Sequence, residues 1–405
     1  MRVAHITTVA LSLRYLLLNQ MQSIRAAGYE VYGVSADGPE VAELAQAGVT
    51  HVPVPLTRKF APLADLRGLW TLYRLFRRER YTIVHTHTAK PGLLGLLAAR
   101  WARVPVIVHT IHGYHFNAET PAWIRRCYIW LERLAARRAD LLLAQGHADL
   151  QLAVAEKICP PEKIRLLGNG IDLARFDPQG LKPADLARRR AALGLREDEL
   201  IVGFVGRLVA EKGIHELLSA ARIVRERVAN VKFLFIGAAD TDKPDALTPA
   251  VAQRYGVAEV CVFTGQQEAM PELYALMNVF VLPSHREGFP RAPMEASAMG
   301  VPIVVSDISG CREAVVPEET GLVFPVCNSA ALAAILVRLL TQPLLAAELG
   351  RAGRHHARRH FNEQTIFAKV IAEYERLLRA KGLDNSYKMG KEKETNVSSR
   401  IKSVA

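Results

Sequence analysis

Two glutamates, Glu287 and Glu295, stand eight residues apart, directly after the apolar run 279–283. The pattern of apolar and polar residues places Glu287 in a turn and Glu295 inside the helix that follows. The free backbone N–H groups at a helix N-terminus favour an anionic, phosphate-bearing ligand. At about 1.5 Å per residue, eight helical residues span roughly 12 Å. That is about the length of a sugar, a diphosphate and a ribose in sequence, so the two carboxylates could accept hydroxyl donors from opposite ends of one long ligand.

A second segment, Gly-Phe-Val-Gly-Arg-Leu at 203–208, ends an apolar run and precedes a helix expected to begin near Gly213. Glycine at position 206 lets the backbone approach a ligand closely. Arg207 is a planar, permanently charged donor that suits two phosphate oxygens, and Lys212 adds a second cation. Together they could neutralise a diphosphate and stabilise the negative charge that develops as it leaves.

Histidines follow two strands expected in the N-terminal half. His112 comes just after the strand at 106–110, at the kind of strand end where α/β proteins bind ligands, and His85 and His87 end the preceding strand. Three histidines can bind a zinc ion, but no acidic or Cys partner stands at ligand spacing here. The Asp-Thr-Asp sequence at 240–242 is expected to form a loop. No metal site is therefore predicted.

The glutamate segment, preceded by Pro-Ser and followed by Ala-x-Gly-x-Pro-Ile-Val, resembles the nucleotide-sugar site of family-4 retaining glycosyltransferases. Three further segments match that family in the right order along the chain: His-Thr-Ile-His-Gly (109–113), Asn-Gly-Ile-Asp (169–172), and Gly-Phe-Val-Gly-Arg-Leu with Glu-Lys-Gly (203–213). The resemblance covers about residues 1–380. Four ordered segments are a strong indication, where any one alone would be weak.

The resemblance assigns roles to individual residues. The family's pattern implies that Glu295 accepts ribose hydroxyls, that Glu287 contacts the transferred sugar, and that His112 orients hydroxyls or takes the acceptor proton. The implied catalytic residues are His112, Arg207, Lys212 and Glu287. The implied donor-binding residues are Gly206, Arg207, Lys212, Thr264, Gly265, Glu287, Gly288, Phe289, Pro290 and Glu295.

Two segments depart from the family's pattern. Many relatives have a Gly-Gly pair after the first strand, where this chain has Thr-Thr-Val-Ala-Leu-Ser-Leu-Arg at 7–14. Arg14 or the hydroxyl groups are the candidates to replace the missing backbone donors. A second Gly-Gly pair is replaced by Ser-Gly-Cys at 309–311.

The net charge of +12 is concentrated in one part of the chain. Residues 57–140 hold fifteen Lys and Arg against five Asp and Glu, which leaves +10 there, and they include all four tryptophans. Basic and aromatic residues on amphipathic helices suit an anionic membrane interface, although the same aromatics could belong to the core. The basic segment has no recognisable nucleic-acid motif, so no nucleic-acid partner is expected.

The remaining composition is that of a globular protein in a reducing compartment. The five cysteines are odd in number and widely spaced, which argues against a disulfide framework and against a zinc site, and each is expected to be a small buried core residue. The first residues lack the apolar region of a signal peptide, and no run reaches the roughly 20 apolar residues that span a bilayer. We therefore expect a cytoplasmic protein, peripheral on the inner face of the membrane.

Short apolar runs alternate with amphipathic helical patterns, which predicts βαβ units and parallel sheets. Expected strands lie at 3–7, 31–35, 51–54, 83–86, 106–110, 141–144 and 164–167, and in a second series at 201–205, 232–236, 260–263, 279–282 and 303–305. Expected domains are an acceptor domain at 1–178, joined by a last helix at 361–380, and a nucleotide-sugar domain at 179–360. A disordered polar tail is expected at 381–405.

These observations and the resemblance together predict an α/β protein of the GT-B fold, with two Rossmann-like domains facing across a cleft. The expected activity is retaining transfer of a hexosyl or N-acetylhexosaminyl group from a nucleotide sugar, expected to be a UDP-sugar, without a required cofactor or metal. The expected acceptor is a lipid-linked saccharide in cell-surface polysaccharide synthesis. The alternatives are a GT-B enzyme of other chemistry, such as a nucleotide-sugar epimerase or a soluble disaccharide-forming transferase, and more remotely a non-catalytic nucleotide- or nucleic-acid-binding protein.

Overall fold

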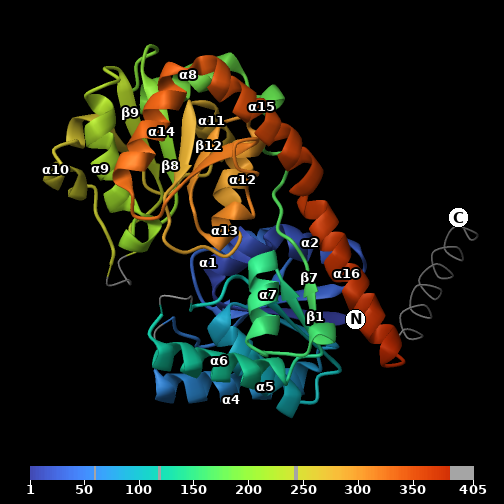
Figure 1. Cartoon of the computed structure of the whole chain (residues 1–405). Coiled ribbons are helices and arrows are strands. Elements are labelled where there is room, and N and C mark those ends of the chain that lie inside the picture. The colour runs from blue at the N-terminus through green and yellow to red at the C-terminus, as the bar shows by residue number, and fades with distance from the viewer. Residues whose placement is uncertain (59–60, 117–119, 241–244, 384–405) are drawn as a thin grey trace, which may run out of the picture. The chain divides into compact units, whose positions relative to one another are not determined.

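The computed structural model describes residues 1–58, 61–116, 120–240 and 245–383 (Figure 1). The chain forms two compact units, which we describe separately. The N-terminal unit comprises Met1–Gly168 together with the residues from Gln364 onward, and the C-terminal unit comprises Asn169–Glu363. Residues 384–405, most of the tail predicted to be disordered, lie outside the described residues.

The N-terminal unit is built on a seven-stranded parallel sheet of order β3-β2-β1-β4-β5-β6-β7. Its strands are β1 (Arg2–Val9), β2 (Glu30–Ala36), β3 (Thr50–Pro53), β4 (Ile83–His87), β5 (Val106–Ile111), β6 (Leu141–Ala144) and β7 (Ile164–Leu166). The order reverses at β1, so β1 and β4 form the switch point at which a parallel α/β sheet binds ligands, beyond the carboxyl ends of the strands.

Helices cover both faces of this sheet. One face packs against α4 (Pro62–Glu79), α5 (Ala89–Trp101) and α6 (Ala122–Ala136) through residues such as Leu72, Leu96 and Ile129. These three helices lie side by side in Figure 1. The other face packs against α2 (Leu18–Ala26) and against α16 (Glu363–Ala380), whose Tyr374 is fully buried. The last helix of the chain therefore belongs to the core of the N-terminal unit.

The C-terminal unit has a six-stranded parallel sheet of order β10-β9-β8-β11-β12-β13. The strands are β8 (Leu200–Val205), β9 (Val231–Ile236), β10 (Cys261–Phe263), β11 (Val279–Leu282), β12 (Ile303–Ser306) and β13 (Gly321–Phe324). Its helices include α9 (Ile214–Arg225), α11 (Met270–Ala275), α12 (Arg291–Ala298), α13 (Ser309–Arg312), α14 (Ser329–Thr341) and α15 (Pro343–His360). Twelve of the strands were predicted, but β13 was missed because its first residue, Gly321, belongs to a Thr-Gly turn signal and only three apolar residues follow it.

The structure bears on the expectations for the cysteines and for membrane-spanning helices. Cys159 and Cys311 are buried as expected, but Cys127 and Cys327 are exposed, so the expectation of core cysteines is wrong for these two. By length and composition no single helix among the described residues could cross a membrane, and α14 and α15 pass that test only as a pair that bends by 100°.

Candidate functional site

The loops after β8 and β11 meet at the switch point of the C-terminal sheet. These two strands are neighbours although β9 and β10 separate them in the chain, so the residues that follow them share one edge of the sheet. Gly213 ends the β8 loop with φ +72°, and a Cβ atom at this position would come within 2.0 Å of the Pro283 carbonyl oxygen. Only glycine allows both the backbone angle and the close approach, and the predicted helix, α9, begins at the next residue.

Lys212 and Glu287, predicted separately as phosphate and sugar contacts, form one ion pair. Lys212 Nζ lies 2.5 Å from Glu287 Oε1, and their side chains are 16% and 12% exposed. The Ser284 hydroxyl donates to the same carboxylate oxygen at 2.7 Å. The structure thus brings a cation, a carboxylate and a hydroxyl together between the two loops, and an incoming anion would compete with Glu287 for the lysine.

Arg207 has a different carboxylate partner. Its Nη1 donates to Asp240 Oδ2 at 2.6 Å, and its side chain is nearly half exposed. Sequence reasoning treated Asp240 only as half of an Asp-x-Asp loop and missed this pairing, because it depends on β8 and β9 being adjacent. The other half, residues 241–242, lies outside the described residues.

Glu295 lies inside α12 and Glu287 in the loop before it, as predicted. However, α12 begins only at Arg291, so half of the eight-residue spacing is not helical and the 12 Å estimate from helical rise does not apply. The Glu295 carboxylate accepts a hydrogen bond of 2.9 Å from the hydroxyl of Tyr274, a fully buried residue of α11. Nothing in the sequence pattern identifies Tyr274, whose hydroxyl fixes one oxygen of Glu295.

The loop formed by Gly288, Phe289 and Pro290 is held from two sides. The Asn169 side-chain amide donates to the Phe289 carbonyl oxygen at 2.7 Å. A Cβ atom at Gly310 would come within 2.3 Å of the carbonyl oxygens of Glu287 and Gly288, so α13 packs directly on this loop. The single glycine of the Ser-Gly-Cys sequence is thus the one that the close contact requires.

The predicted nucleobase edge adjoins the β8 loop through a backbone ladder. Thr264 N donates to the Phe235 carbonyl oxygen at 3.1 Å, and Gly237 N donates to the Gly265 carbonyl oxygen at 2.9 Å. Gly206 N in turn donates to the carbonyl oxygen of the last residue of β9 at 2.9 Å. The turns after β8, β9 and β10 therefore form one continuous surface.

Histidines of the N-terminal unit lie within β1 and β4 and directly after β5. His87 Nδ1 lies 3.1 Å from His112 Nε2, and His87 Nε2 lies 3.0 Å from His5 Nδ1. Burial lowers the pKa of His112 to about 4, although a hydrogen bond with Gln145 acts in the opposite direction. His112 is therefore neutral at pH 7, and its orientation is set by a chain of imidazoles that runs into the core.

The same region holds a cluster with metal-ligand spacing that the sequence analysis did not assemble, because His5 joins it from β1. Nitrogens of His5, His85 and His87 lie within 4.8 Å of one another. Both nitrogens of His85 already have protein partners, the Tyr374 hydroxyl at 2.6 Å and the Thr110 hydroxyl at 2.7 Å. A metal ion would have to displace these hydrogen bonds, so we assign the cluster to the buried hydrogen-bond network.

The segment in place of the Gly-Gly pair continues β1 to Val9 and then enters a short helix. The Thr7 hydroxyl donates to the Val9 carbonyl oxygen at 2.9 Å, and Arg14 Nε pairs with Glu43 at 2.5 Å. Arg14 and the Thr7 hydroxyl are thus engaged within the N-terminal unit.

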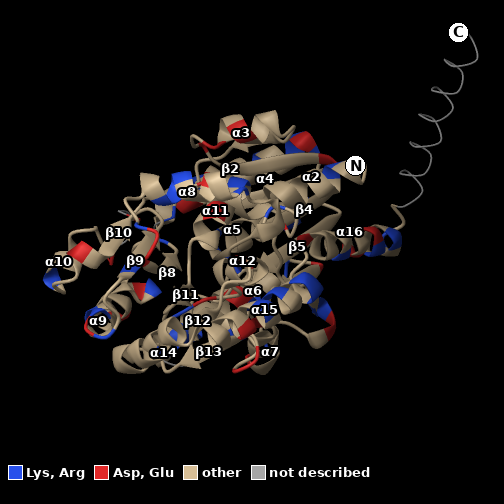
Figure 2. Cartoon of the chain, turned by 90° about the horizontal axis from the view of Figure 1, so that it is seen from above, with Lys and Arg blue, Asp and Glu red and all other residues tan. Residues whose placement is uncertain are grey.

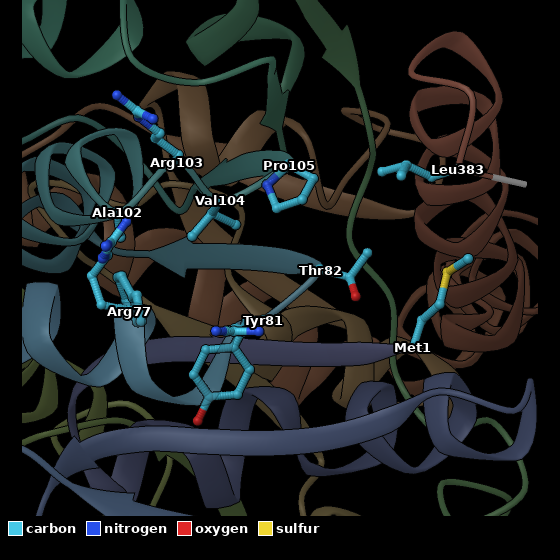
Figure 3. Close-up of a pocket in the computed structure, with 11 residues that line it drawn as sticks. Met1, Arg77, Tyr81, Thr82, Ala102, Arg103, Val104, Pro105 and Leu383 are labelled. Atoms are coloured by element: carbon cyan, nitrogen blue, oxygen red, sulfur yellow. The ribbon is translucent and has the colours of Figure 1, made fainter. Parts of the chain in front are cut away.

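A pocket of about 530 Å³ lies at the opposite edge of the N-terminal sheet (Figure 3). Met1, Thr82 and Pro105, which precede β1, β4 and β5, line it together with Arg77 and Arg103. None of the predicted site residues lines this pocket. Because α/β sheets bind ligands at the carboxyl ends of their strands, we do not place the site there.

Comparison with known proteins gives matches along most of the chain. A family model described as "Glycosyl transferases group 1" matches residues 187–356, and one described as "Glycosyltransferase Family 4" matches residues 15–175. The chain is 29% identical over 391 residues to the capsular polysaccharide biosynthesis glycosyltransferase CapM of Staphylococcus aureus, covering 93% of this chain and 98% of that one.

Two further matches concern a lipid-linked acceptor and a bound nucleotide sugar. The chain is 33% identical over 255 residues to an Escherichia coli enzyme named UDP-Gal:alpha-D-GlcNAc-diphosphoundecaprenol alpha-1,3-galactosyltransferase, covering 63% of this chain and 65% of that one. The fold of this chain matches the crystal structure of Anabaena HepE in complex with UDP-glucose, with a TM-score of 0.79 at 22% identity, covering 92% of this chain and 99% of that one.

Proposed function

Because the chain belongs to glycosyltransferase family 4 and has the GT-B fold with its two Rossmann-like domains, we propose that this glycosyltransferase moves a sugar from UDP to a lipid-linked saccharide, with retention of configuration, in the synthesis of a cell-surface polysaccharide. Support for the donor is the UDP-glucose bound in the Anabaena structure of the same fold. Support for the acceptor and the pathway is the named activity of the Escherichia coli and Staphylococcus aureus relatives.

The proposal rests above all on the cations at the switch point of the C-terminal sheet. The Glu287 carboxylate holds Lys212, and the Asp240 carboxylate holds Arg207. A diphosphate would replace these carboxylates as the partner of each cation, because its oxygens accept two or more charge-assisted hydrogen bonds at once. Glu287 would then be available to the hydroxyls of the transferred sugar, and Glu295 to those of the ribose.

The reaction breaks the bond between the anomeric carbon and the β-phosphate oxygen, and forms one from the same carbon to an acceptor oxygen. The leaving UDP gains negative charge, which Arg207 and Lys212 stabilise in place of a metal ion. The acceptor proton passes to the leaving phosphate or to His112, which is neutral at pH 7 and so has a lone pair to accept it. Retention corresponds to attack from the face that the phosphate leaves.

Saturation-transfer NMR with UDP-, GDP- and ADP-sugars, in EDTA, tests the donor site directly. We expect one UDP-sugar to bind without metal and Glu295→Ala to weaken it. Tyr274→Phe should weaken it less, by up to about tenfold, since one hydrogen bond to a charged group is worth about 1.5 kcal/mol. Binding that requires added Mg²⁺ would refute the metal-free proposal, and no binding by any member would refute the donor assignment. Product analysis with and without acceptor separates transfer from epimerisation.

We also propose that the N-terminal unit lies on an anionic membrane surface, on the cytoplasmic face. The alternative that its aromatics are core is wrong for the tryptophans: Trp70, Trp101, Trp123 and Trp130 are 51%, 53%, 71% and 62% exposed. Leu63 and Leu66, two turns and one turn before Trp70 on α4, are 87% and 64% exposed.

Exposed basic residues accompany these apolar side chains. On α6, Arg126 and Arg133 are exposed beside Trp123 and Trp130, and on α4 the Arg74 guanidinium lies over the Trp70 ring at 5.4 Å. The end of α16 in the same unit carries both basic and acidic residues (Figure 2), and Arg376 and Arg379 pair there with Glu373 and Glu375. Exposed Trp and Leu among arginines provide both the apolar and the electrostatic parts of interfacial binding.

Vesicle flotation tests this surface. We expect the protein to bind phosphatidylcholine vesicles that contain phosphatidylglycerol, and not pure phosphatidylcholine, and to dissociate as salt is raised. Replacing Trp123 and Trp130 by Ala should weaken binding at least about tenfold, since a large apolar side chain that leaves water contributes roughly 1.5–3 kcal/mol. Leu344→Ala, which removes an 86% exposed side chain from the other unit, is the matched control. Equal binding by wild type and the double variant would argue against this surface.

A further inference from the structure

A glutamate, a histidine and a cysteine from three segments converge in the C-terminal unit. Glu216 lies in the first turn of α9, His285 in the loop after β11, and Cys327 after β13. One ligand atom from each lies within 4.8 Å of the other two. No residue of this cluster is among the predicted donor-site residues, so the cluster is a separate feature of the unit.

The distances within the cluster match those between ligands of one zinc ion. His285 Nε2 lies 3.0 Å from Glu216 Oε1 and 3.8 Å from Cys327 Sγ. Ideal tetrahedral coordination with Zn–N, Zn–O and Zn–S bonds near 2.0–2.3 Å separates the nitrogen from the oxygen by roughly 3.4 Å and from the sulfur by roughly 3.6 Å. These two distances need shifts of only a few tenths of an ångström, and the ligand atoms of Glu216 and Cys327 lie within 4.8 Å of each other.

The glutamate has bonding capacity that the described residues do not use. Glu216 Oε2 is buried, and within the described parts of the chain it has no hydrogen-bond partner. The side chain is 14% exposed, whereas His285 is 36% exposed and Cys327 lies on the surface. One side of the cluster is thus open to an arriving ion and to a water as its fourth ligand.

Cys327 is placed by an uncommon backbone conformation. Its φ of +59° lies in the left-handed region, which favours glycine and which other residues rarely adopt. A thiolate and an imidazole are ligands that zinc prefers, whereas magnesium and calcium prefer oxygen. We propose that Glu216, His285 and Cys327 bind one Zn²⁺ ion, with an open fourth position.

Zinc bound here would restrain the loop that leads to Glu287. Two contacts already join this loop to Glu211, in the loop between β8 and α9. His285 N donates to the Glu211 carbonyl oxygen at 2.9 Å, and Arg286 pairs with the Glu211 carboxylate at 2.7 Å. The ion would add α9 and the segment after β13 as further anchors. Metal binding itself does not depend on the proposed function, and it can be measured without substrate.

Cobalt(II) titration of the untagged, chelator-treated and reduced protein tests the site, because a cobalt–thiolate bond gives a charge-transfer band in the near ultraviolet. We expect this band to saturate at one equivalent, to be displaced by Zn²⁺, and to be lost in Cys327→Ser. His285→Ala should weaken cobalt binding by at least about tenfold, the loss seen when even an outer partner of a metal ligand is removed. A histidine-only site elsewhere would not produce the thiolate band.

Two variants keep the result interpretable. Cys127→Ser removes the other exposed thiol, from α6, and should leave the titration unchanged. Cys327→Gly removes the thiol while relieving the left-handed strain, so it should raise the thermal midpoint of the metal-free protein and abolish the further rise that Zn²⁺ causes in the wild type. No thiolate band in the wild type, or an undiminished zinc-induced shift in Cys327→Gly, would overturn the proposal.

Discussion

Replacing Lys212 by Met is expected to lower kcat by about 10²–10³-fold, the loss typical when one donor to a developing anion is removed. The change keeps the length and apolar stem of the side chain and removes only its charge. In the proposed reaction that charge meets the leaving diphosphate. Steady-state kinetics with the UDP-sugar identified by NMR measure the effect.

The ion pair with Glu287 offers a second explanation, because the lysine could serve only to neutralise this glutamate. Lys212→Met leaves a largely buried carboxylate with the Ser284 hydroxyl as its remaining donor among the contacts described above. We expect this to cost roughly 1–3 kcal/mol of unfolding free energy, less than the value for a fully buried pair. Adding Glu287→Gln should recover most of that stability.

The double variant therefore separates the two roles. If Lys212 acts on the leaving group, adding Lys212→Met to Glu287→Gln lowers kcat further, by about 10²–10³-fold relative to Glu287→Gln alone. If Lys212 serves only to neutralise Glu287, the double variant is as active as Glu287→Gln alone, which would exclude a catalytic role for the lysine. Arg312→Ala is the matched control: it removes an exposed ion pair with Asp307 in the same unit and should change stability by no more than about 0.5 kcal/mol.

The strands and the site loops could be predicted because each depends on local sequence. Short apolar runs between amphipathic helices locate β1 to β12, and the glycines and charges after β8 and β11 mark loops at strand ends. The pattern failed at β13, where only three apolar residues follow the Thr-Gly turn signal. It also placed helical geometry across the whole spacing of Glu287 and Glu295, although α12 begins only at Arg291.

Side-chain partners from neighbouring strands and helices could not be predicted, because residue spacing does not determine the order of the strands. Asp240 contacts Arg207 only because β9 adjoins β8. Tyr274 contacts Glu295 only because the fold of the C-terminal unit brings α11 close to α12. The same holds for His5, which reaches His87 from β1 because the order reverses there. The sequence also did not show which apolar side chains are exposed to solvent. Cys327 was expected in the core and the tryptophans could have belonged to it, but all are exposed.

The buried histidines predict that the N-terminal unit loses stability steeply as pH falls below about 6.5. Burial lowers the pKa of His5 and His109 to about 3 and that of His112 to about 4, and it lowers the pKa values of His85 and His87 well below their usual range. Below about pH 6.5 the unfolded chain binds protons that the folded unit does not, so stability rises with pH through this window and is complete above it.

One carboxyl acts in the opposite direction. Burial raises the pKa of Glu132 to about 7, so the folded unit keeps this proton while the unfolded chain has lost it above about pH 4.5. This carboxyl therefore lowers the free energy of unfolding as pH rises toward 7, and it offsets the contribution of about one of the five histidines. At about 1.4 kcal/mol per proton and pH unit, the net slope reaches about 5 kcal/mol per pH unit, against a total stability of about 5–15 kcal/mol for a domain.

Urea unfolding followed by tryptophan fluorescence measures this slope for the N-terminal unit alone, because all four tryptophans belong to it. We expect the urea midpoint to be nearly constant above pH 7 and to fall sharply between pH 6.5 and 5.5. His5→Leu should reduce the slope by about one proton, since His5 Nε2 has no partner among the described residues and an apolar side chain can replace it. His147→Asn, at an exposed position in the same unit, should leave the slope unchanged. A midpoint that does not move between pH 7.5 and 5.5 would mean that these histidines bind protons in the folded unit as readily as in the unfolded chain, which would contradict the prediction.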